Sequence, residues 1–165
     1  MRIVLTFLLV CMSTSIVSAQ AYDGSGDQKF QVGANLQDKG TGMRLSYDMG
    51  LGEQISIGLS SSYLFGVEEL LNIGFVDRFD AKARANLHLG SMLGIGDNFD
   101  MYPGLNLSLK NFGFHAGARY FFSDGIGVYA VVEHPIARYK SKGRSPAEEL
   151  HNQMVINFGL SLNFL

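Results

Sequence analysis

The sequence has little cysteine, proline or charge, and it has no tryptophan. Its single cysteine is Cys11, so the rest of the chain has no disulfide framework, no thiolate nucleophile and no cysteine metal site. Only 3 residues are proline and 17% are charged, while 20 glycines are scattered among alternating apolar residues. This composition argues against a disordered tail, a coiled coil and a collagen-like fibre. The length of 165 residues fits one domain.

Long apolar runs and an excess of positive charge are also missing. After residue 20 no run reaches about 18 consecutive apolar residues, the length that a spanning helix needs, so a multi-helix membrane protein is excluded. Lys and Arg number 13 against 15 Asp and Glu, a net charge of -2, which leaves no basic footprint for nucleic acid. The sequence also has no phosphate-binding glycine loop and no metal-ligand cluster.

The first 19 residues have the pattern of a secretory signal peptide. Arg2 supplies a short positive region, residues 3–12 an apolar core, and residues 17–19 a small-residue cleavage site. We therefore expect export and cleavage after Ala19, followed by a short periplasmic segment at residues 20–28 and a barrel domain at residues 29–165. A retained anchor and lipidation at Cys11 are the less favoured alternatives.

From residue 30 onward the dominant pattern is an alternation of apolar and polar residues, the period of a β-strand. One face of the pattern carries no charged residue, and Ser61 and His134 are its only clearly polar members. The other face mixes glycine, serine and asparagine with charged residues. The pattern predicts eight antiparallel strands. The runs are 30–36, 43–49, 55–65, 79–89, 99–109, 112–122, 126–134 and 154–164.

Two architectures share this pattern: a soluble barrel with its apolar face inside, and a membrane barrel with that face toward lipid. The polar face favours the membrane barrel. A water-exposed surface is normally about a quarter to a third charged, whereas this face is rich in glycine, which leaves room inside a narrow barrel. Its charges balance, as buried charges must. We predict an eight-stranded antiparallel up-and-down transmembrane β-barrel with a polar, filled lumen; the alternative is a soluble periplasmic lipocalin-type barrel that binds an apolar ligand.

The connection lengths agree with a membrane barrel, which has short periplasmic turns and longer outer loops. Residues 38–42, 67–78, 110–111 and 140–152 are the predicted outer connections, and residues 50–53, 90–98 and 123–125 the periplasmic ones. Proline cannot donate to a ladder, so Pro103 predicts a bulge or a break in its strand.

Several segments resemble known proteins. The signal peptide, the eight runs and the final strand NFGLSLNFL (157–165) are similar to the small eight-stranded outer-membrane barrels of Gram-negative bacteria. The segments GDQKFQVGAN (26–35), YPGLNL (102–107) and RYFFSDG (119–125) resemble a family of uncharacterised outer-membrane β-barrel proteins. The resemblance implies the cell outer membrane, insertion by the barrel-assembly machinery, and no known reaction. Its insertion signal corresponds to Phe158, Leu160, Leu162 and Phe164.

The balanced charges of the polar face predict an ion-pair network inside the barrel. Because successive strands run in opposite directions, four charges should fall in the outer half of the lumen and four in the inner half, each half with no net charge. Such a network either holds the lumen closed or gates a narrow pore. The outer set is Arg44, Asp80, Lys82 and Glu133, and the inner set is Asp48, Arg84, Asp100 and Arg119.

Two further kinds of site were considered. A lipid-modifying enzyme would need a nucleophile, a base and an acid within reach, for which His115, Glu133 and Ser108 are the only constellation that the sequence offers. We expect no catalysis, no cofactor and no metal. The outer loops could instead carry a binding or adhesion role, or their basic residues could pair with lipopolysaccharide phosphates. The loop residues are Glu68, Glu69, Phe75, Lys140, Lys142 and Arg144.

The prediction is thus an outer-membrane β-barrel protein, expected to be a monomer, with a structural or surface-interaction role. Its expected partners are outer-membrane lipid, lipopolysaccharide and the barrel-assembly machinery, without nucleic acid.

Overall fold

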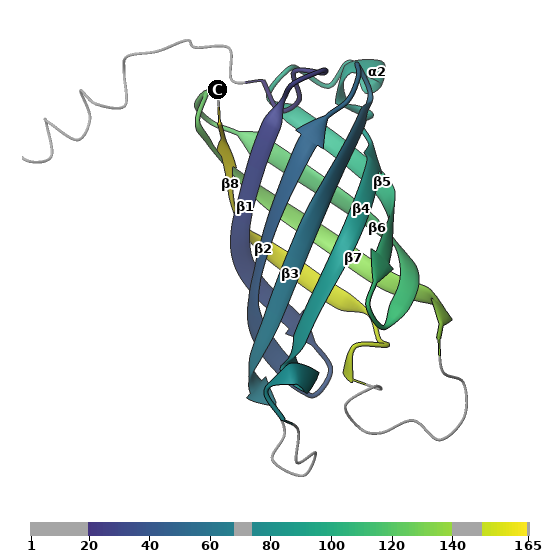
Figure 1. Ribbon diagram of the computed structural model, residues 1–165. Coiled ribbons are helices and arrows are strands. Elements are labelled where there is room, and N and C mark those ends of the chain that lie inside the picture. Colours follow the sequence, from purple (N-terminus) through teal and green to yellow (C-terminus); the bar gives the residue numbers. More distant parts are fainter. Residues whose placement is uncertain (1–19, 68–73, 140–149, 165) are drawn as a thin grey trace, which may run out of the picture.

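The computed structural model describes residues 20–67, 74–139 and 150–164; the predicted signal peptide at residues 1–19 lies outside them. The described chain forms a closed barrel of eight antiparallel strands in which each strand pairs with the next and β1 closes on β8 (Figure 1). The predicted eight-stranded antiparallel barrel is therefore confirmed. The strands are β1 Gln28–Gln37, β2 Gly40–Gly50, β3 Ile55–Val67, β4 Phe79–Leu87, β5 Phe99–Ser108, β6 Asn111–Phe121, β7 Ile126–Arg138 and β8 Val155–Asn163.

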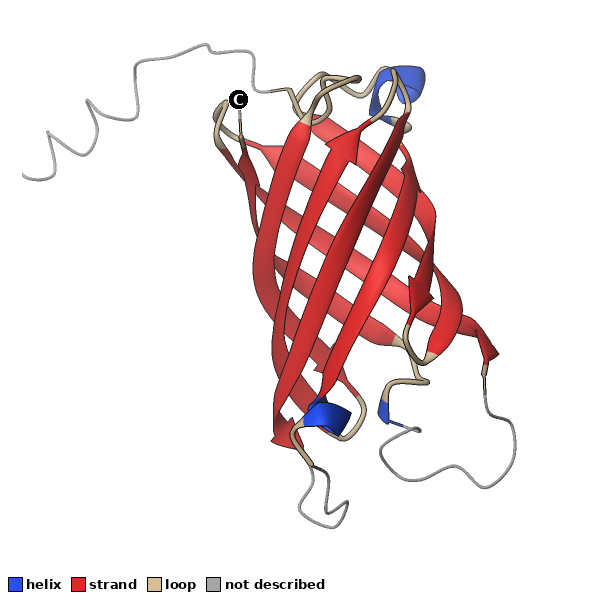
Figure 2. Ribbon diagram, in the orientation of Figure 1, coloured by secondary structure: helices blue, strands red, loops and turns tan. Residues whose placement is uncertain are grey.

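The barrel has two unlike ends. One end, called here the termini end, carries residues 20–27 and 164, the β2–β3 and β6–β7 turns, and the short helix α2 (Gly90–Leu93). The other, the loop end, carries the β1–β2 and β5–β6 turns, the 3-10 helix η2 (Val76–Arg78) and the β7–β8 connection. Figure 2 shows how little of the described chain is helical. Among the described residues, no helix is long and apolar enough to cross a membrane.

The two faces of the wall differ in chemistry. Large apolar side chains point outward along every strand and are exposed, such as Leu59 at 67% and Leu105 at 50%. The side chains that alternate with them point inward and are mostly polar or charged and buried. In the described strands the outward positions carry no charged residue except Arg138, the last residue of β7. The strand period thus places the apolar face outside and the polar face inside.

The prediction of a bulge or break at Pro103 is wrong. Strand β5 runs through it, and Pro103 pairs in register with Ala116 of β6. The position of the missing N–H explains why β5 still pairs with β6. The Met101 carbonyl accepts a hydrogen bond from the Leu89 N–H, 2.8 Å, on the side of β4. Backbone groups two residues apart in a strand point to the same side, so the nitrogen of Pro103 also faces β4 and not β6. The β4–β5 ladder accordingly ends at Asn86 and Gly104, just before the proline.

The register shifts lie elsewhere, near the loop end. One falls in β3, where Gly42 pairs with Leu64 and Thr41 with Gly66. The other falls in β7, where Phe112 pairs with Ala137 and Gly113 with Pro135. Pairing of β7 with β8 starts at Glu133, so Pro135 lies where β7 has a neighbour on one side only. Proline is tolerated at such positions, where a strand lacks one neighbour and is bulged.

Residues 20–27, which belong to the predicted periplasmic segment 20–28, pack across the termini end. The Ala21 N–H donates to the Asp97 carbonyl, 2.7 Å, and Ala21 is fully buried beside Phe121. The Gly26 N–H donates to the Gly50 carbonyl, 2.9 Å, and the Gly50 N–H to the Asp27 carbonyl, 2.8 Å. The segment thus covers this end of the lumen with residues that carry no strand period.

Candidate functional site in the barrel interior

The interior is built from the inward residues of the strands, which bring charges from five strands together. The structure places all eight residues of the predicted network there, seven of them buried and Lys82 partly exposed. The predicted halves correspond to two separate groups of ion pairs. The loop-end cluster is Arg44, Asp80, Lys82 and Glu133, and the termini-end cluster is Asp48, Arg84, Asp100 and Arg119, joined by His88.

Glu133 is the centre of the loop-end cluster. Its Oε1 lies 3.0 Å from Arg44 Nη2 and its Oε2 accepts from Lys82 Nζ at 2.6 Å. Lys82 Nζ is also 3.8 Å from Asp80 Oδ2, and Ser108 Oγ donates to Asp80 Oδ1 at 2.6 Å. Two cations face two carboxylates, so the cluster can be buried without net charge.

The termini-end cluster consists of two ion pairs rather than one linked set. Arg84 Nη1 lies 3.5 Å from Asp48 Oδ2, and Arg119 Nη2 lies 3.0 Å from Asp100 Oδ2. The Asn86 amide donates to Asp48 Oδ1 at 3.1 Å and so supports that carboxylate from β4. Each pair is neutral by itself.

Sequence reasoning missed the groups that complete this end. Lys29 of β1 forms an ion pair with Asp27 and donates to Asn163 Oδ1 at 2.9 Å. Tyr22 stacks on the His88 ring with centroids 3.6 Å apart, and its hydroxyl meets the carbonyl oxygens of Gly52 and Ile55, each at 2.7 Å. Burial, and then the Asp27 carboxylate, raise the pKa of Tyr22 to about 12, so its hydroxyl is neutral. Nothing in the alternation marks residues 20–27, because their contacts are long-range.

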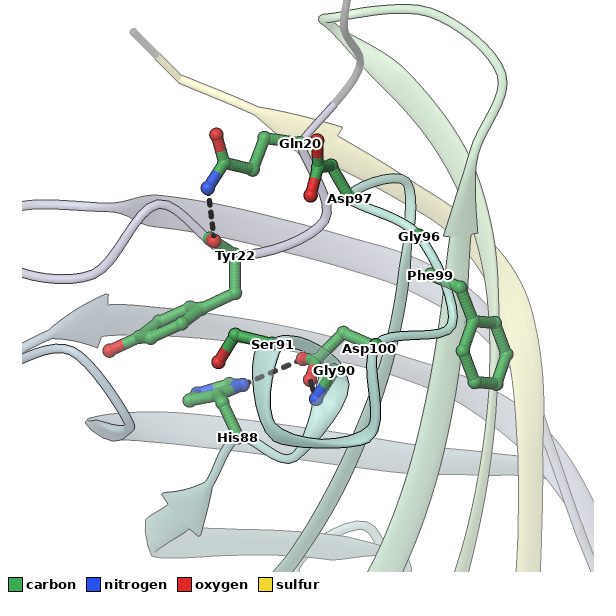
Figure 3. A pocket seen from close by; sticks show the side chains of 10 residues that line it. Gln20, Tyr22, His88, Gly90, Ser91, Gly96, Asp97, Phe99 and Asp100 are labelled. Carbon is green, nitrogen blue, oxygen red and sulfur yellow. Dashed lines mark hydrogen bonds and ion pairs between the residues drawn. The ribbon is translucent and has the colours of Figure 1, made fainter.

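His88 follows the last residue of β4 and is buried against the termini-end cluster. Its Nδ1 lies 2.7 Å from Asp100 Oδ2, and its Nε2 lies 2.8 Å from Ser56 Oγ of β3. Burial lowers the pKa of His88 below its ordinary 6.5, so the ring is neutral at pH 7. Figure 3 shows Tyr22 above the ring and the bond to Asp100 beside it.

Large side chains also fill the lumen. Tyr102 and Val131 form one buried group with Tyr129, while buried Phe121 packs on Ala21 at the termini end and buried Leu64 lies near Gly40 at the loop end. Glycine provides the space for some of them: any side chain at Gly117 would run into the Tyr102 ring. The glycine-rich polar face is therefore a packing device for a narrow barrel.

The described residues line a cavity at each cluster. The larger, about 170 Å³, lies at the termini end between the N-terminal segment and the α2 loop, and its lining includes Tyr22, His88 and Asp100. The smaller, about 10 Å³, is lined by Arg44, Lys82 and Glu133 among others and has room for about one water molecule.

The side chains of His115, Glu133 and Ser108, the candidate catalytic residues from the sequence, do not hydrogen-bond to one another and have other partners. His115 and Glu133 face each other across β6 and β7, but Glu133 binds Arg44 and Lys82. His115 Nε2 lies 2.7 Å from the Asn86 side-chain oxygen, and Ser108 donates to Asp80. All three side chains therefore have other partners.

The predicted surface residues fall partly outside the described chain: Glu68, Glu69, Lys140, Lys142 and Arg144 lie outside it. Phe75 is 74% exposed and its ring packs on Tyr63, with centroids 5.0 Å apart. The predicted insertion signal lies on the outer face of β8 and just beyond it, with Phe158, Leu160 and Phe164 exposed and Leu162 partly so.

The part of the chain that the structure describes contains no cluster of three or more His, Cys, Asp or Glu side chains that could hold a metal ion. No curated protein matches the sequence. A family model covers residues 12–164, which is nearly the whole chain and includes all eight strands. The chain therefore belongs to this family, DUF6646, which is described as a family of unknown function.

Proposed function

We propose that this chain is an outer-membrane β-barrel protein with a structural or surface-interaction role. The observation that carries the proposal is the outward face of the described strands. This face is apolar all round the barrel, and its only charged residue within these strands is Arg138 at the end of β7. A contiguous apolar surface of this extent would drive association in water. Toward lipid it is the band that a membrane barrel requires.

The dimensions support the same proposal. The described strands are 9 to 13 residues long, and a tilted transmembrane strand needs about 9 to 11 residues. A closed barrel leaves no strand edge free for pairing with a second copy, which favours a monomer. The outward apolar residues of β8, Phe158 and Leu160, suit recognition by the barrel-assembly machinery.

The interior argues against the two alternatives. A lipocalin-type carrier of an apolar ligand needs an apolar interior, whereas the described interior is lined mainly by polar and charged side chains. A narrow pore needs a continuous water path, whereas paired charges and buried Tyr102 and Phe121 occupy this lumen. Both observations favour a structural core that holds the barrel rigid.

The charges at the two ends suggest an orientation. Exposed Asp23, Glu53 and Asp97 make the termini end acidic, and no exposed Lys or Arg accompanies them among the described residues there. Within the described residues, the loop end carries Lys39, Arg78, Lys110 and Arg138 against Asp38 and Asp77. Lipopolysaccharide phosphates attract such cations, so we place the loop end at the cell surface.

The lipid-facing surface is tested by the same substitution at two outward positions of β2. Leu45→Arg places a charge at mid-strand, and Thr41→Arg places it near the strand end. In a bilayer Leu45→Arg should lower the free energy of unfolding by about 2 to 4 kcal/mol and Thr41→Arg by about 0 to 1 kcal/mol. The measurement is urea unfolding in lipid vesicles, in which the gel shift between unboiled and boiled samples reports the folded fraction. Equal, small effects together with a water-soluble wild type would overturn the membrane assignment.

The orientation is tested with single cysteines, because the only natural cysteine is Cys11. Asp38→Cys and Glu53→Cys place exposed thiols in the turns at the two ends of β2. A membrane-impermeant maleimide applied to intact cells should label Asp38→Cys, and should label Glu53→Cys only after lysis. The reverse pattern would contradict the orientation.

A further inference from the structure

Three side chains at the termini end form a hydrogen-bonded series that is chemically distinct from the ion pairs around it. Ser56 Oγ lies 2.8 Å from His88 Nε2, and His88 Nδ1 lies 2.7 Å from Asp100 Oδ2. They come from β3, from the residue after β4, and from β5, and all three are buried. A serine, a histidine and an aspartate joined in this order are the arrangement that activates a serine hydroxyl.

The shorter contacts assign the proton positions in the series. His88 Nδ1 lies 2.7 Å from Asp100 Oδ2 and 3.2 Å from Arg119 Nη2, and the closer carboxylate contact assigns the hydrogen of neutral His88 to Nδ1, which donates to Asp100. His88 Nε2 is then an acceptor, and the Ser56 hydroxyl donates to it. The Asn86 amide donates to Ser56 Oγ at 2.8 Å, which leaves the serine proton directed at the imidazole.

Asp100 is itself held in place. Arg119 Nη2 lies 3.0 Å from Asp100 Oδ2, and the Gly90 N–H donates to Asp100 Oδ1 at 3.2 Å. Both contacts hold the carboxylate in place, and it in turn orients the imidazole and offsets the positive charge that His88 gains when it accepts a proton. Asp100 is therefore a positioning residue.

A cavity and a lid adjoin the series. The cavity of about 170 Å³ is lined by His88 and Asp100, and Tyr22 covers the His88 ring. Tyr22 is held by hydrogen bonds to carbonyl oxygens in the β2–β3 turn and at the start of β3, one residue before Ser56. Withdrawal of residues 20–27 would uncover the imidazole from the cavity side.

We propose that Ser56 is an activated serine nucleophile with His88 as its general base, and that it accepts an acyl group from an ester when Tyr22 moves aside. Ser56 Oγ forms a bond to the ester carbonyl carbon while its proton passes to His88 Nε2. The carbon–alkoxy bond then breaks, and the alcohol leaves with the proton from His88. Water, deprotonated by His88, cleaves the acyl-serine to a carboxylic acid and restores the hydroxyl.

Other buried serines of the barrel provide an internal comparison. Ser46 Oγ donates to the Gln31 side-chain oxygen at 3.1 Å, and Ser108 Oγ donates to Asp80 at 2.6 Å. Neither has a ring nitrogen as its partner, so neither hydroxyl has an imidazole to take its proton. We therefore expect Ser56 to react in preference to Ser46 and Ser108.

The test uses a small alkyl fluorophosphonate, which loses fluoride when a serine oxygen attacks phosphorus. The barrel with residues 20–165 is folded in detergent and incubated with the probe, and adducts are located by peptide mass mapping. We expect an adduct on Ser56 in the wild type, faster labelling in Tyr22→Ala, and a loss of about 100-fold or more in His88→Gln, since a general base contributes about 10²- to 10⁴-fold. Ser46→Ala serves as the matched control and should label as the wild type does.

Two results would overturn the proposal: no Ser56 adduct in either the wild type or Tyr22→Ala, or an adduct that forms at the wild-type rate in His88→Gln. If Tyr22→Ala fails to fold, as judged by the gel shift on boiling, Tyr22→Leu keeps an apolar cover while removing both hydrogen bonds of the hydroxyl. The experiment runs in detergent, so its outcome does not depend on where the protein resides in the cell.

Discussion

The loop-end and termini-end clusters both neutralise charges inside the barrel, but they do so with different arrangements of partners. At the loop end, the Glu133 carboxylate forms ion pairs with two cations, Arg44 and Lys82, and all four charged residues of the cluster lie in strands. At the termini end the pairs are separate, and they are completed by His88 after β4 and by Tyr22 before β1. The loop-end cavity has room for about one water molecule, whereas the termini-end cavity is far larger. A cluster built within strands can close completely, while one that depends on segments outside the strands keeps room for a second molecule and can open.

The largest effect is expected from neutralising the shared carboxylate of the loop-end cluster. Glu133→Gln leaves buried Arg44 and partly exposed Lys82 without that charge. Breaking a buried pair costs about 3 to 5 kcal/mol, so we expect a loss of that size in the free energy of unfolding. Urea unfolding followed by circular dichroism measures it. Asp124→Asn, in the β6–β7 turn, is the control and should stay within about 0.5 kcal/mol. A small loss in Glu133→Gln would show that the cluster does not stabilise the barrel.

A smaller effect should follow from removing the lid at the termini end. Tyr22→Ala deletes the ring that covers His88 and the hydroxyl that meets two carbonyl oxygens. We expect a loss of about 2 kcal/mol, less than a core aromatic costs, because Tyr22 is only partly buried. Phe75→Ala at the loop end removes an exposed aromatic ring and should cost under about 0.5 kcal/mol. Equal losses in the two variants would mean that residues 20–27 do not stabilise the termini end.

The smallest effect is a pH dependence that belongs to the termini end. Burial keeps the pKa of folded His88 below 6.5, so above pH 6.5 the ring is neutral in both states and its contribution is constant. As the pH falls below 6.5 the unfolded chain binds a proton that folded His88 resists, and the free energy of unfolding decreases. His88→Gln should reduce this slope between pH 6.5 and pH 5 in urea unfolding. The charged and titratable groups around the ring are Asp100, Arg119 and Tyr22. An unchanged slope would show that His88 is not the source of the pH dependence.

The period-two alternation was enough to predict the barrel, its connections and the inward position of the network residues. It could not predict that Ala21 and Tyr22 would pack on the barrel, because their partners, Asp97, Gly52 and Ile55, lie 30 or more residues away and follow no period. The outcome at Pro103 depended on which neighbour its missing N–H faced, and that orientation follows only from the ladder.

The alternation could not predict which polar side chains form hydrogen bonds with one another. The sequence offered Ser108, His115 and Glu133 as a serine–histidine–acid set, whereas the structure joins Ser56, His88 and Asp100. Ser56, His88 and Asp100 all lie on the polar face of the sequence pattern, as Ser108, His115 and Glu133 do. The cross-strand register of His115 with Glu133 is observed, but hydrogen bonds depend on side-chain rotamers, and Arg44 and Lys82 occupy the glutamate. Alternation predicts which side chains share the lumen, but which of them meet depends on the folded structure.

The pairing of β1 with β8 has a consequence for how the molecule is made. The first and last strands of the barrel lie in register from Lys29 opposite Asn163 to Gln37 opposite Val155, so the sheet closes only when the final residues are available. Any shorter chain keeps two unsatisfied edges and an apolar outer surface, a combination that invites aggregation. Closure therefore waits for β8, and it should be slow because it joins the two strands that lie farthest apart in the sequence.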